Sequence, residues 1–308
     1  MITRRHLCAA TLGAFALELA ARASLAQTAP QTGYIRVPIT LSESRMPVVE
    51  LKLNGKGPYR FILDTGATHT IIRASLAREL GLVAGTQETV GYSIKGTERL
   101  IPYVVPEVII GGALRLRNWG VYGSRGWDDS DFDGLLSADL LTRMPCQLDY
   151  HASEIRYYLS RPMSLEGFTA VDGYFRTNIQ GGADQVHLRL KLSGRSLDCL
   201  LDTGAGLPLY IRGDFVKKHK LWDQYPVLEP IRMTGVNGKV LEGRMVEISD
   251  LHIGGVKVPK LEVALGDPKD TAGYIRGDDS PPGLVGAGFL SDFVLAFAAD
   301  RSLHIRAA

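Results

Sequence analysis

The sequence lacks several features that would assign its 308 residues to a specialised class. Lys and Arg total 35 against 33 Asp and Glu, so it has no basic excess of the kind that nucleic-acid-binding proteins gather on one face. Its three cysteines form no Cys-x-x-Cys pair and no His/Cys cluster of zinc spacing. Hydrophobic residues make up 45% and charged residues 22%, as in an ordinary globular protein rather than a bundle of membrane spans. We therefore expect no nucleic-acid partner and no structural zinc.

Glycine, by contrast, is abundant, with 34 residues. Many glycines and few aromatic residues favour a fold of short strands joined by tight turns. The chain is also about twice as long as a typical domain, which indicates two domains or two lobes.

Residues 1–26 have the pattern of an export signal. Arg4 and Arg5 provide a charged start, and Leu7–Leu17 is an uncharged, mostly apolar run that is too short to span a bilayer comfortably. The two arginines also fit the bacterial twin-arginine pattern. The alternative is an uncleaved N-terminal anchor, which Glu18 within the apolar stretch disfavours. We expect a periplasmic or secreted protein with no integral membrane segment after the signal is removed.

Two cysteines, Cys146 and Cys199, remain after removal of the predicted signal. An oxidising compartment would allow them to pair. Each lies in an apolar, strand-like stretch, so two buried free thiols are the favoured interpretation.

One pattern is written twice in the mature chain. An alternating strand, a glycine turn and an apolar strand lead to Asp-Thr-Gly-Ala, first over Val48–Gly55 and Tyr59–Ala67, then over Val186–Gly194 and Ser196–Ala205. Alternation with a period of two before a glycine turn is typical of a β-hairpin. The sequence therefore predicts two related hairpins that each end in an aspartate.

The match continues downstream of both aspartates. Predicted helices over 73–80 and 214–220 are followed by the similar runs Asp133–Leu141 and Pro282–Leu290, and then by predicted strands. These strands cover 147–150 and 294–297. We interpret the chain as a signal over 1–26, an N-terminal lobe over 27–165 and a C-terminal lobe over 166–308.

Two such copies resemble the aspartic proteases, over about residues 35–308. The plan of two lobes is similar to pepsin, and the short lobes with Ala after Gly are similar to tandem retroviral proteases. The resemblance implies an all-β fold of two pseudo-symmetric closed barrels with a cleft between them, and Asp64 and Asp202 as the catalytic pair. Ser137 departs from the family pattern, which usually has glycine at this turn.

Each residue around the two aspartates has a chemical reason to be there. Two adjacent carboxyls cannot both ionise, so one serves as base and the other as acid toward a water molecule and a carbonyl. The threonines would brace the two turns, the glycines would let backbone N–H groups approach, and the alanines would leave out a hydroxyl that lowers the carboxyl pKa. These supporting residues are Thr65, Gly66, Ala67, Thr203, Gly204 and Ala205. We expect activity closer to neutral pH than in acid-acting relatives.

The resemblance also implies a hairpin that covers the substrate. The candidate is Thr89–Thr97, in which Gly91 and Tyr92 would contact substrate, although Tyr92 fits an ordinary surface aromatic equally well. Met233–Lys239 is the corresponding segment of the second lobe. His69 is expected to be a solvated or core-edge residue.

The sequence thus predicts an exported aspartic endopeptidase, acting as a monomer on peptide or protein substrates without metal or cofactor. Asp129–Gly134 begins like a calcium loop, but Leu140 stands where a bidentate Glu is needed. A non-catalytic peptide-binding protein on the same fold is the alternative. A glycosidase also uses two carboxylates, but it needs no paired Asp-Thr-Gly. For a single copy, each aspartate could equally be a turn residue.

Overall fold

The computed structural model describes residues 33–93, 96–159, 161–177, 182–234, 240–269 and 281–308. These residues form β-strands in three sheets with a few short helices, which confirms the predicted all-β class. The predicted export signal over 1–26 lies outside this part of the chain. Within it, no helix is both long and apolar enough to cross a membrane.

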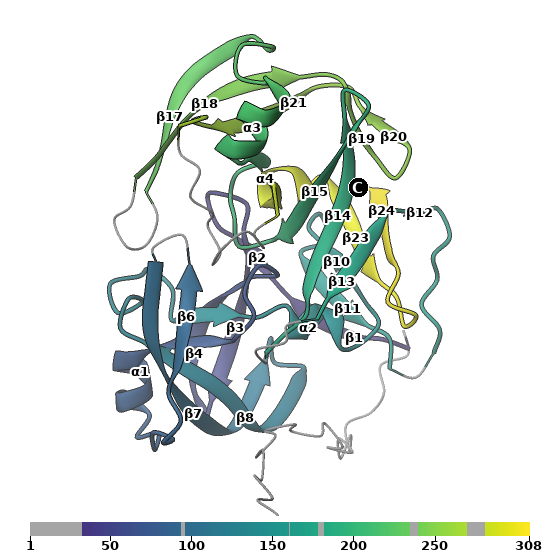
Figure 1. Ribbon diagram of the computed structural model, residues 1–308. Helices are drawn as coiled ribbons and strands as arrows, with labels where there is room; N and C mark the ends of the chain where they lie inside the picture. Colours follow the sequence, from purple (N-terminus) through teal and green to yellow (C-terminus); the bar gives the residue numbers. More distant parts are fainter. Residues whose placement is uncertain (1–32, 94–95, 160, 178–181, 235–239, 270–280) are drawn as a thin grey trace, which may run out of the picture.

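The first half of the chain forms a closed barrel, in the lower part of Figure 1. Its strands follow the order β2-β3-β4-β9-β5-β8-β7-β6, and an additional pairing of β3 with β7 closes the ring. The elements are β2 Thr40–Leu41, β3 Pro47–Leu53, β4 Lys56–Leu63, β5 Ile71–Arg73, α1 Ala74–Glu79, β6 Thr89–Ser93, β7 Gly96–Ile110, β8 Leu114–Ser124, β9 Gly134–Leu136 and α2 Asp139–Thr142.

The second half repeats most of these pairings, in the upper part of Figure 1. Its strand order is β17-β18-β21-β16-β22-β15-β14-β19-β20, with β13 paired to β14. The elements are β13 Gly173–Arg176, β14 Gln185–Leu192, β15 Arg195–Asp202, β16 Leu209–Ile211, α3 Gly213–His219, β17 Val227–Thr234, β18 Val240–Ile248, β19 Leu251–Ile253, β20 Val256–Val258, β21 Leu261–Gly266, β22 Gly283–Gly286 and α4 Ala287–Leu290.

The predicted hairpins are present in both halves. In β3, Leu51 and Leu53 are buried while Lys52 between them is exposed, as the alternation requires. The turns that follow, Asn54-Gly55 and Ser193-Gly194, hold both residues at positive φ, which suits a tight two-residue hairpin. The helices predicted over 73–80 and 214–220 are confirmed as α1 and α3.

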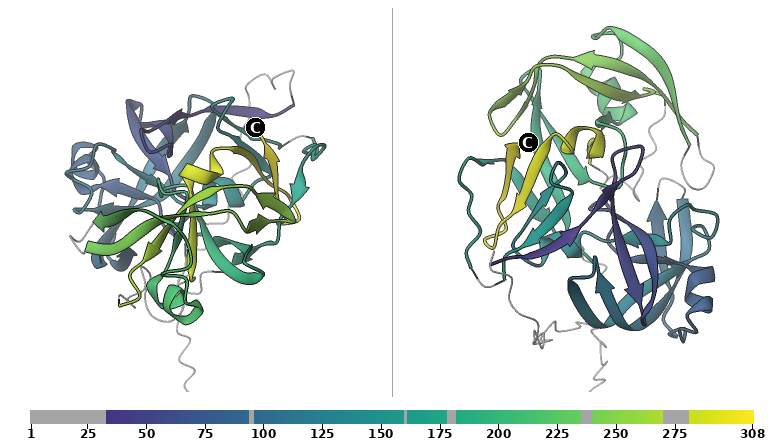
Figure 2. Two further views of the ribbon diagram at one scale, coloured as in Figure 1. Left: turned by 90° about the horizontal axis from the view of Figure 1, so that it is seen from above. Right: turned by 180° about the vertical axis from the view of Figure 1, so that it is seen from behind.

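A third sheet joins the two halves and lies beside both of them in the two views of Figure 2. Its order is β1-β11-β10-β23-β24-β12, in which β10 of the first half pairs antiparallel with β23 of the second. Its strands are β1 Ile35–Pro38, β10 Cys146–Asp149, β11 Glu154–Tyr157, β12 Thr169–Ala170, β23 Phe293–Phe297 and β24 Leu303–Ala307. The two strands predicted near 147–150 and 294–297 are therefore direct neighbours. The lobe boundary stays a prediction.

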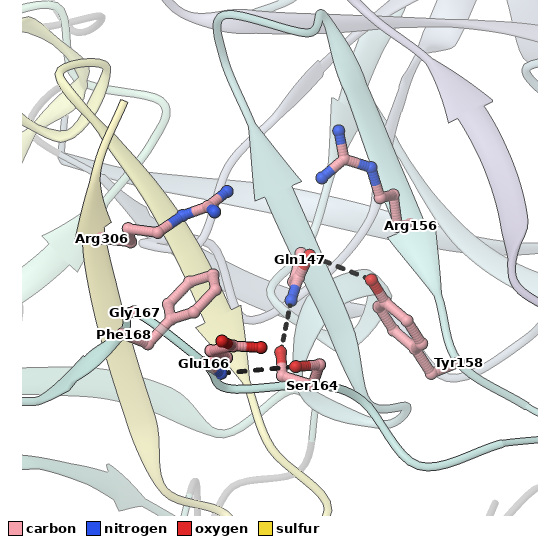
Figure 3. Close-up of a pocket in the computed structure, with 8 residues that line it drawn as sticks. All are labelled: Gln147, Arg156, Tyr158, Ser164, Glu166, Gly167, Phe168 and Arg306. Carbon is pink, nitrogen blue, oxygen red and sulfur yellow. Dashed lines mark hydrogen bonds between the residues drawn. The ribbon is translucent and has the colours of Figure 1, made fainter.

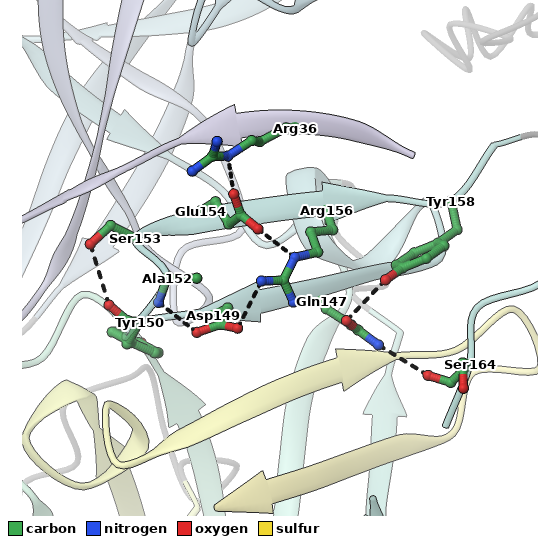
Figure 4. A network of polar contacts seen from close by, with 10 residues as sticks. All are labelled: Arg36, Gln147, Asp149, Tyr150, Ala152, Ser153, Glu154, Arg156, Tyr158 and Ser164. Atoms are coloured by element: carbon green, nitrogen blue, oxygen red, sulfur yellow. Dashed lines mark hydrogen bonds and ion pairs between the residues drawn. The ribbon is translucent and has the colours of Figure 1, made fainter. Parts of the chain in front are cut away.

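One face of the joining sheet carries a chain of polar contacts (Figure 4). Glu154 is buried, and its carboxylate forms ion pairs with both Arg36 and Arg156. Arg156 also pairs with Asp149 at 3.0 Å. Buried charges are tolerated when each has a partner, so this chain satisfies acidic groups that the sheet would otherwise bury at a cost.

The main core runs through both halves and the joining sheet. Cys146 and Cys199 belong to it as buried free thiols, which confirms the favoured interpretation over a disulfide. Burial raises the pKa of both thiols, so they stay protonated and behave as small apolar side chains.

Candidate active site

Asp64 and Asp202 stand at equivalent points of the two halves. Asp64 directly follows β4, and its N–H donates to the Leu136 carbonyl of the parallel strand β9 at 2.9 Å. Asp202 is the last residue of β15, where it pairs with Gly286 of the parallel strand β22. In each half, a buried apolar strand thus ends at an aspartate whose side chain remains partly exposed.

The two aspartates meet, although 138 residues separate them in the chain. A hydrogen bond joins their carboxyl groups. A Cβ atom on Gly66 would lie 2.7 Å from the Asp202 Cγ, and one on Gly204 would lie 2.5 Å from the Asp64 Cγ. Each glycine therefore leaves the space that the aspartate of the other half occupies. This role is additional to the predicted one, which is to let backbone N–H groups approach the carboxyls.

Thr65 and Thr203 bind the two loops to each other. The Thr65 N–H donates to the Thr203 hydroxyl at 3.1 Å, and the Thr203 N–H donates to the Thr65 hydroxyl at 3.0 Å. The Thr65 hydroxyl donates to the Leu201 carbonyl at 2.7 Å, and the Thr203 hydroxyl donates to the Leu63 carbonyl at 2.6 Å. Both threonines are fully buried. These four bonds brace the two turns across the halves, as the sequence predicts.

Backbone donors hold each carboxylate in place. Asp64 Oδ1 accepts the N–H of Gly66 at 2.8 Å and the N–H of Ala67 at 3.1 Å. Asp202 Oδ1 accepts the N–H of Gly204 at 2.9 Å. Fixed donors of this kind stabilise the ionised form of a carboxyl group.

Burial raises the pKa of both carboxyls. Burial raises the pKa of Asp64, while the hydrogen bond from Asp202 and the N–H groups of Gly66 and Ala67 oppose the rise. Burial, the charge of Asp64 and the hydrogen bond to it all act together to raise the pKa of Asp202 well above its usual range. The pair therefore holds one proton where isolated aspartates would hold none.

Two small apolar clusters flank the pair, apart from the main core. In the first half Ala67 packs on a cluster formed by Ile62, Ile71, Leu100 and Leu135, together with Met46, Tyr122, Trp127 and Phe132. In the second half Ala205 packs on a cluster formed by Leu200, Tyr210, Met245, Ala264 and Leu284, together with Leu207 and Ile231. The methyl groups of the two alanines therefore join apolar surface beside each aspartate.

Ser137 stands at a turn where glycine is the usual residue, and its side chain fits there. Its side chain is buried, and its N–H donates to the Thr70 hydroxyl at 3.2 Å. The equivalent position of the second half is Gly286, because β9 and β22 pair with β4 and β15 in the same way. There a Cβ atom would lie 2.1 Å from the Leu207 carbonyl oxygen, so only glycine fits.

The predicted cover of the site is a hairpin in the structure. β6 and β7 pair antiparallel, with Thr89 opposite Leu100 and Tyr92 opposite Thr97. Gly91 packs closely, since a Cβ atom on it would lie 2.7 Å from the Leu100 Cδ1. The part of the chain that the structure describes leaves out the Tyr92 side chain, residues 94–95 between β6 and β7, and residues 235–239 between β17 and β18. Contact between this hairpin and a substrate stays a prediction.

His69 lies on the Asp64 loop at the edge of the core, as expected. Its ring meets the edge of the Tyr122 ring at a centroid distance of 4.8 Å, and its Nδ1 bonds the Thr68 hydroxyl at 2.9 Å. Burial lowers the His69 pKa. A neutral histidine here adds no positive charge beside the carboxyl pair.

Sequence reasoning missed two segments that cross between the halves. The Ala183 N–H donates to the Thr68 carbonyl at 2.7 Å, and the Gln185 side-chain amide donates to the Gly66 carbonyl at 3.2 Å. On the other side, Ser44 packs on Gly206, where a Cβ atom would lie 2.6 Å from the Ser44 Cβ. The only signal in the sequence is position, since both segments directly precede the first strand of a repeat.

A separate cavity of about 410 Å³ lies on the joining sheet (Figure 3). Arg156, Arg306, Glu166 and Phe168 are among its lining residues, and neither aspartate is. The Arg306 guanidinium lies 4.9 Å from the centre of the Phe168 ring. The cavity offers no pair of adjacent carboxyls, so its chemistry differs from that of the Asp64–Asp202 site.

A metal ion has no evident place among the described residues, which contain no group of three or more His, Cys, Asp or Glu side chains arranged to hold one. The chemistry available at the Asp64–Asp202 site is that of two carboxyls sharing a proton. Such a pair can remove a proton from water and donate one to a carbonyl oxygen.

Comparison with known proteins agrees with this chemistry over the first half of the chain. Residues 49–140 match the family described as aspartyl protease, and this stretch contains Asp64 and the turn at Ser137. No curated protein matches the chain. The match supports an aspartic protease family for this chain, and with it protease activity in general.

Proposed function

We propose that the protein is an exported aspartic endopeptidase in which Asp64 and Asp202 activate a water molecule for attack on a peptide bond. The observation that carries this proposal is that each aspartate lies against the loop of the other, although 138 residues separate them: a Cβ atom on Gly66 would lie 2.7 Å from the Asp202 Cγ, and one on Gly204 would lie 2.5 Å from the Asp64 Cγ. Aspartic proteases are the standard example of such a shared proton, so the chemistry matches a known case.

In the proposed reaction the ionised Asp64 takes a proton from water as its oxygen attacks the carbonyl carbon. Asp202 gives its proton to the carbonyl oxygen, forming a neutral tetrahedral intermediate. Asp64 then gives its proton to the amide nitrogen as the C–N bond breaks, and Asp202 takes a proton from a hydroxyl of the intermediate as the carbonyl re-forms, so the pair returns to its starting state. The braced loops hold both carboxyls in position throughout, which avoids reorganisation during the reaction.

The substrates we propose are peptides with apolar side chains near the cleaved bond. The support is the pair of apolar clusters that contact Ala67 and Ala205 directly beside the aspartates. Since neither alanine has a hydroxyl to lower the carboxyl pKa, we propose an activity optimum nearer neutral pH than in acid-acting relatives. The export signal, the periplasmic or secreted location, the duplicated origin of the two lobes and the monomeric state also remain proposals.

The proposal is tested by expressing residues 27–308 and measuring cleavage of a peptide library across pH. We expect Asp64→Asn and Asp202→Asn each to lower kcat/KM by roughly 10²- to 10⁴-fold, the usual contribution of general acid–base groups. Asp198→Asn is the matched control, since Asp198 lies on the same strand as Asp202 but bonds to Tyr174 at 2.7 Å instead of to the pair.

Two outcomes would overturn the proposal. One is retention of cleavage in either pair variant, which would remove the need for a shared dyad. The other is peptide binding without turnover that Asp64→Asn leaves unchanged, which would identify a binding protein on the same fold. Release of reducing sugar from polysaccharides would instead indicate a glycosidase.

A further inference from the structure

Each half sends a short segment to the aspartate loop of the other half. Ser44, ahead of β3, packs on Gly206 beside Asp202, and Ala183, ahead of β14, donates to the Thr68 carbonyl beside Asp64. The two segments are equivalent in position, but their chemistry differs. Among the described residues, only the second segment continues into a side-chain hydrogen bond to the opposite aspartate loop, through Gln185, the first residue of β14.

This hydrogen bond reaches Asp64 through a single peptide group. The Gln185 amide donates to the Gly66 carbonyl at 3.2 Å. The N–H of the same peptide group is that of Ala67, which donates to Asp64 Oδ1 at 3.1 Å. A donor on the carbonyl oxygen polarises a peptide group and strengthens the bond that its N–H makes, and it also fixes the orientation of the group.

Within the part of the chain that the structure describes, the second aspartate has no such support. Val48 pairs with Ile62 and His187 pairs with Leu200, and these partners precede Asp64 and Asp202 by the same two positions. The register therefore makes Met46 the equivalent of Gln185. A methionine side chain has no N–H or O–H to donate. The two halves thus hold their aspartates with nearly the same backbone bonds, and of the two only Asp64 has an additional donor behind its loop from a residue that the structure describes.

We propose that Gln185 is a positioning residue that holds the Gly66–Ala67 peptide group against Asp64, and so keeps the negative charge of the pair on Asp64 and the shared proton on Asp202. The inference rests on the proposed function, because it assigns base and acid to particular aspartates. A symmetric site could use either carboxyl in either role. The Gln185 amide makes the two carboxyls different, so the roles of base and acid are assigned before substrate binds.

Other charged groups around the pair do not supply this asymmetry. The buried Tyr150 interacts with the charge of Asp202, but burial raises the Tyr150 pKa, so the hydroxyl stays neutral. Arg45 acts on Tyr150 from the surface, and His69 on the Asp64 loop is kept neutral by burial, with Asp139 opposing that effect. Neither carboxyl of the pair forms an ion pair with a described Arg or Lys.

The test is to replace Gln185 by the residue of the other half, as Gln185→Met, and to follow the two carboxyl carbons by carbon-13 NMR as pH changes. Asp64→Asn and Asp202→Asn assign the signals. In the singly protonated state we expect the ratio of charge on Asp64 to charge on Asp202 to fall about threefold. Gln224→Met is the matched control, since the Gln224 amide bonds Ser193 and Tyr225, away from the pair.

The second readout is activity. We expect the acid limb of kcat/KM against pH to shift upward by about half a pH unit in Gln185→Met, with a melting temperature close to that of the unchanged protein. Gln185→Ala is the second variant and should shift both readouts in the same direction. An unchanged charge ratio in both variants would overturn the inference.

The two readouts separate this inference from the proposed function. The NMR titration needs no substrate, so it reports on Gln185 even if no peptide is cleaved. A protein that shows the threefold change but cleaves nothing would retain the role of Gln185 in placing the proton and lose the endopeptidase assignment. A protein that cleaves peptides with an unchanged charge ratio would keep its function and lose the role of Gln185.

Discussion

The two halves differ in their barrel walls and agree at the site. In the first half, β7 runs for 15 residues and β8 for 11 without interruption. In the second half the corresponding wall is broken twice, into β18 and β19 and again into β20 and β21. The pairing that closes the first barrel, β3 with β7, corresponds to the pairing of β14 with the separate strand β19.

The break in the second barrel is held by local polar contacts. Asp250, between β18 and β19, accepts a hydrogen bond from the Ser193 hydroxyl, and its backbone carbonyl accepts the Ser193 N–H at 3.3 Å. Tyr225 bonds the same serine at 2.9 Å. The strands of a barrel contribute to their own half, so they can be interrupted and held together by local contacts of this kind. The aspartate loops contact each other, so a change in one loop must be matched in the other.

The strongest test of this agreement is to add one methyl group to each site glycine. Gly66→Ala and Gly204→Ala would each place a Cβ atom within 2.7 Å of the opposite aspartate Cγ. We expect kcat/KM to fall by about 10²-fold or more in both variants, because displacing a catalytic group by about 1 Å has that effect.

The matched control is Gly120→Ala, since nothing lies within 4 Å of a Cβ atom at that strand position. Its activity should equal that of the unchanged protein. If one of the two site variants kept full activity while the other lost it, the equivalence of the two loops would be wrong.

The next comparison exchanges the distal turns. Gly286→Ser brings a Cβ atom to 2.1 Å from the Leu207 carbonyl oxygen, and we expect it to lower the free energy of unfolding by about 3 kcal/mol. Ser137→Gly removes the buried hydrogen bond between the Ser137 and Thr70 hydroxyls, 3.3 Å long, and should cost only about 1 kcal/mol. Urea unfolding followed by fluorescence measures both. Equal losses would mean that the two turns are equally tight.

The smallest effect concerns pH. The folded-state pKa of Asp202 is raised, so its contribution to stability is present below the ordinary pKa of an aspartate and is lost as pH rises through the folded value. Asp202→Asn removes this dependence. We expect its free energy of unfolding relative to the unchanged protein to rise by about 1 kcal/mol as pH increases from acid to neutral.

Asp198→Asn gives the opposite sign. Burial pushes the pKa of Asp198 upward, but hydrogen bonds from His187 and Tyr174 outweigh it and lower the pKa. Its stabilising effect is therefore present above the ordinary aspartate pKa and is lost as pH falls. Melting temperatures measured across this pH range distinguish the two variants, and parallel profiles would contradict the raised pKa of Asp202.

Much of the fold follows from local pattern. The alternation in β3 and the Asn54-Gly55 turn define the first hairpin, and the same signals define the second at Ser193-Gly194. Helix α1 lies within the range that the sequence predicts, and α3 begins one residue before its predicted range. The repeated Asp-Thr-Gly-Ala marks Asp64 and Asp202, because a repeat in matching frames is visible without knowing how the copies pack.

Contacts between the halves could not be read in this way. The sequence predicts that Thr65 and Thr203 brace the turns, but it gives no reason for Gly66 and Gly204 to face the opposite carboxyl. It also places Gln185 at the start of an ordinary strand. Such contacts depend on the relative placement of two lobes, which no local pattern encodes.

The amino-acid sequence alone determined the two copies, their hairpins and the pair of aspartates, because strand period and turn chemistry act over a few neighbouring residues. Tertiary structure alone decided that the two carboxyls share a hydrogen bond and that Gln185 lies behind only one of them. The physical reason is that proton sharing depends on distances of a few ångströms between groups that the chain itself keeps far apart.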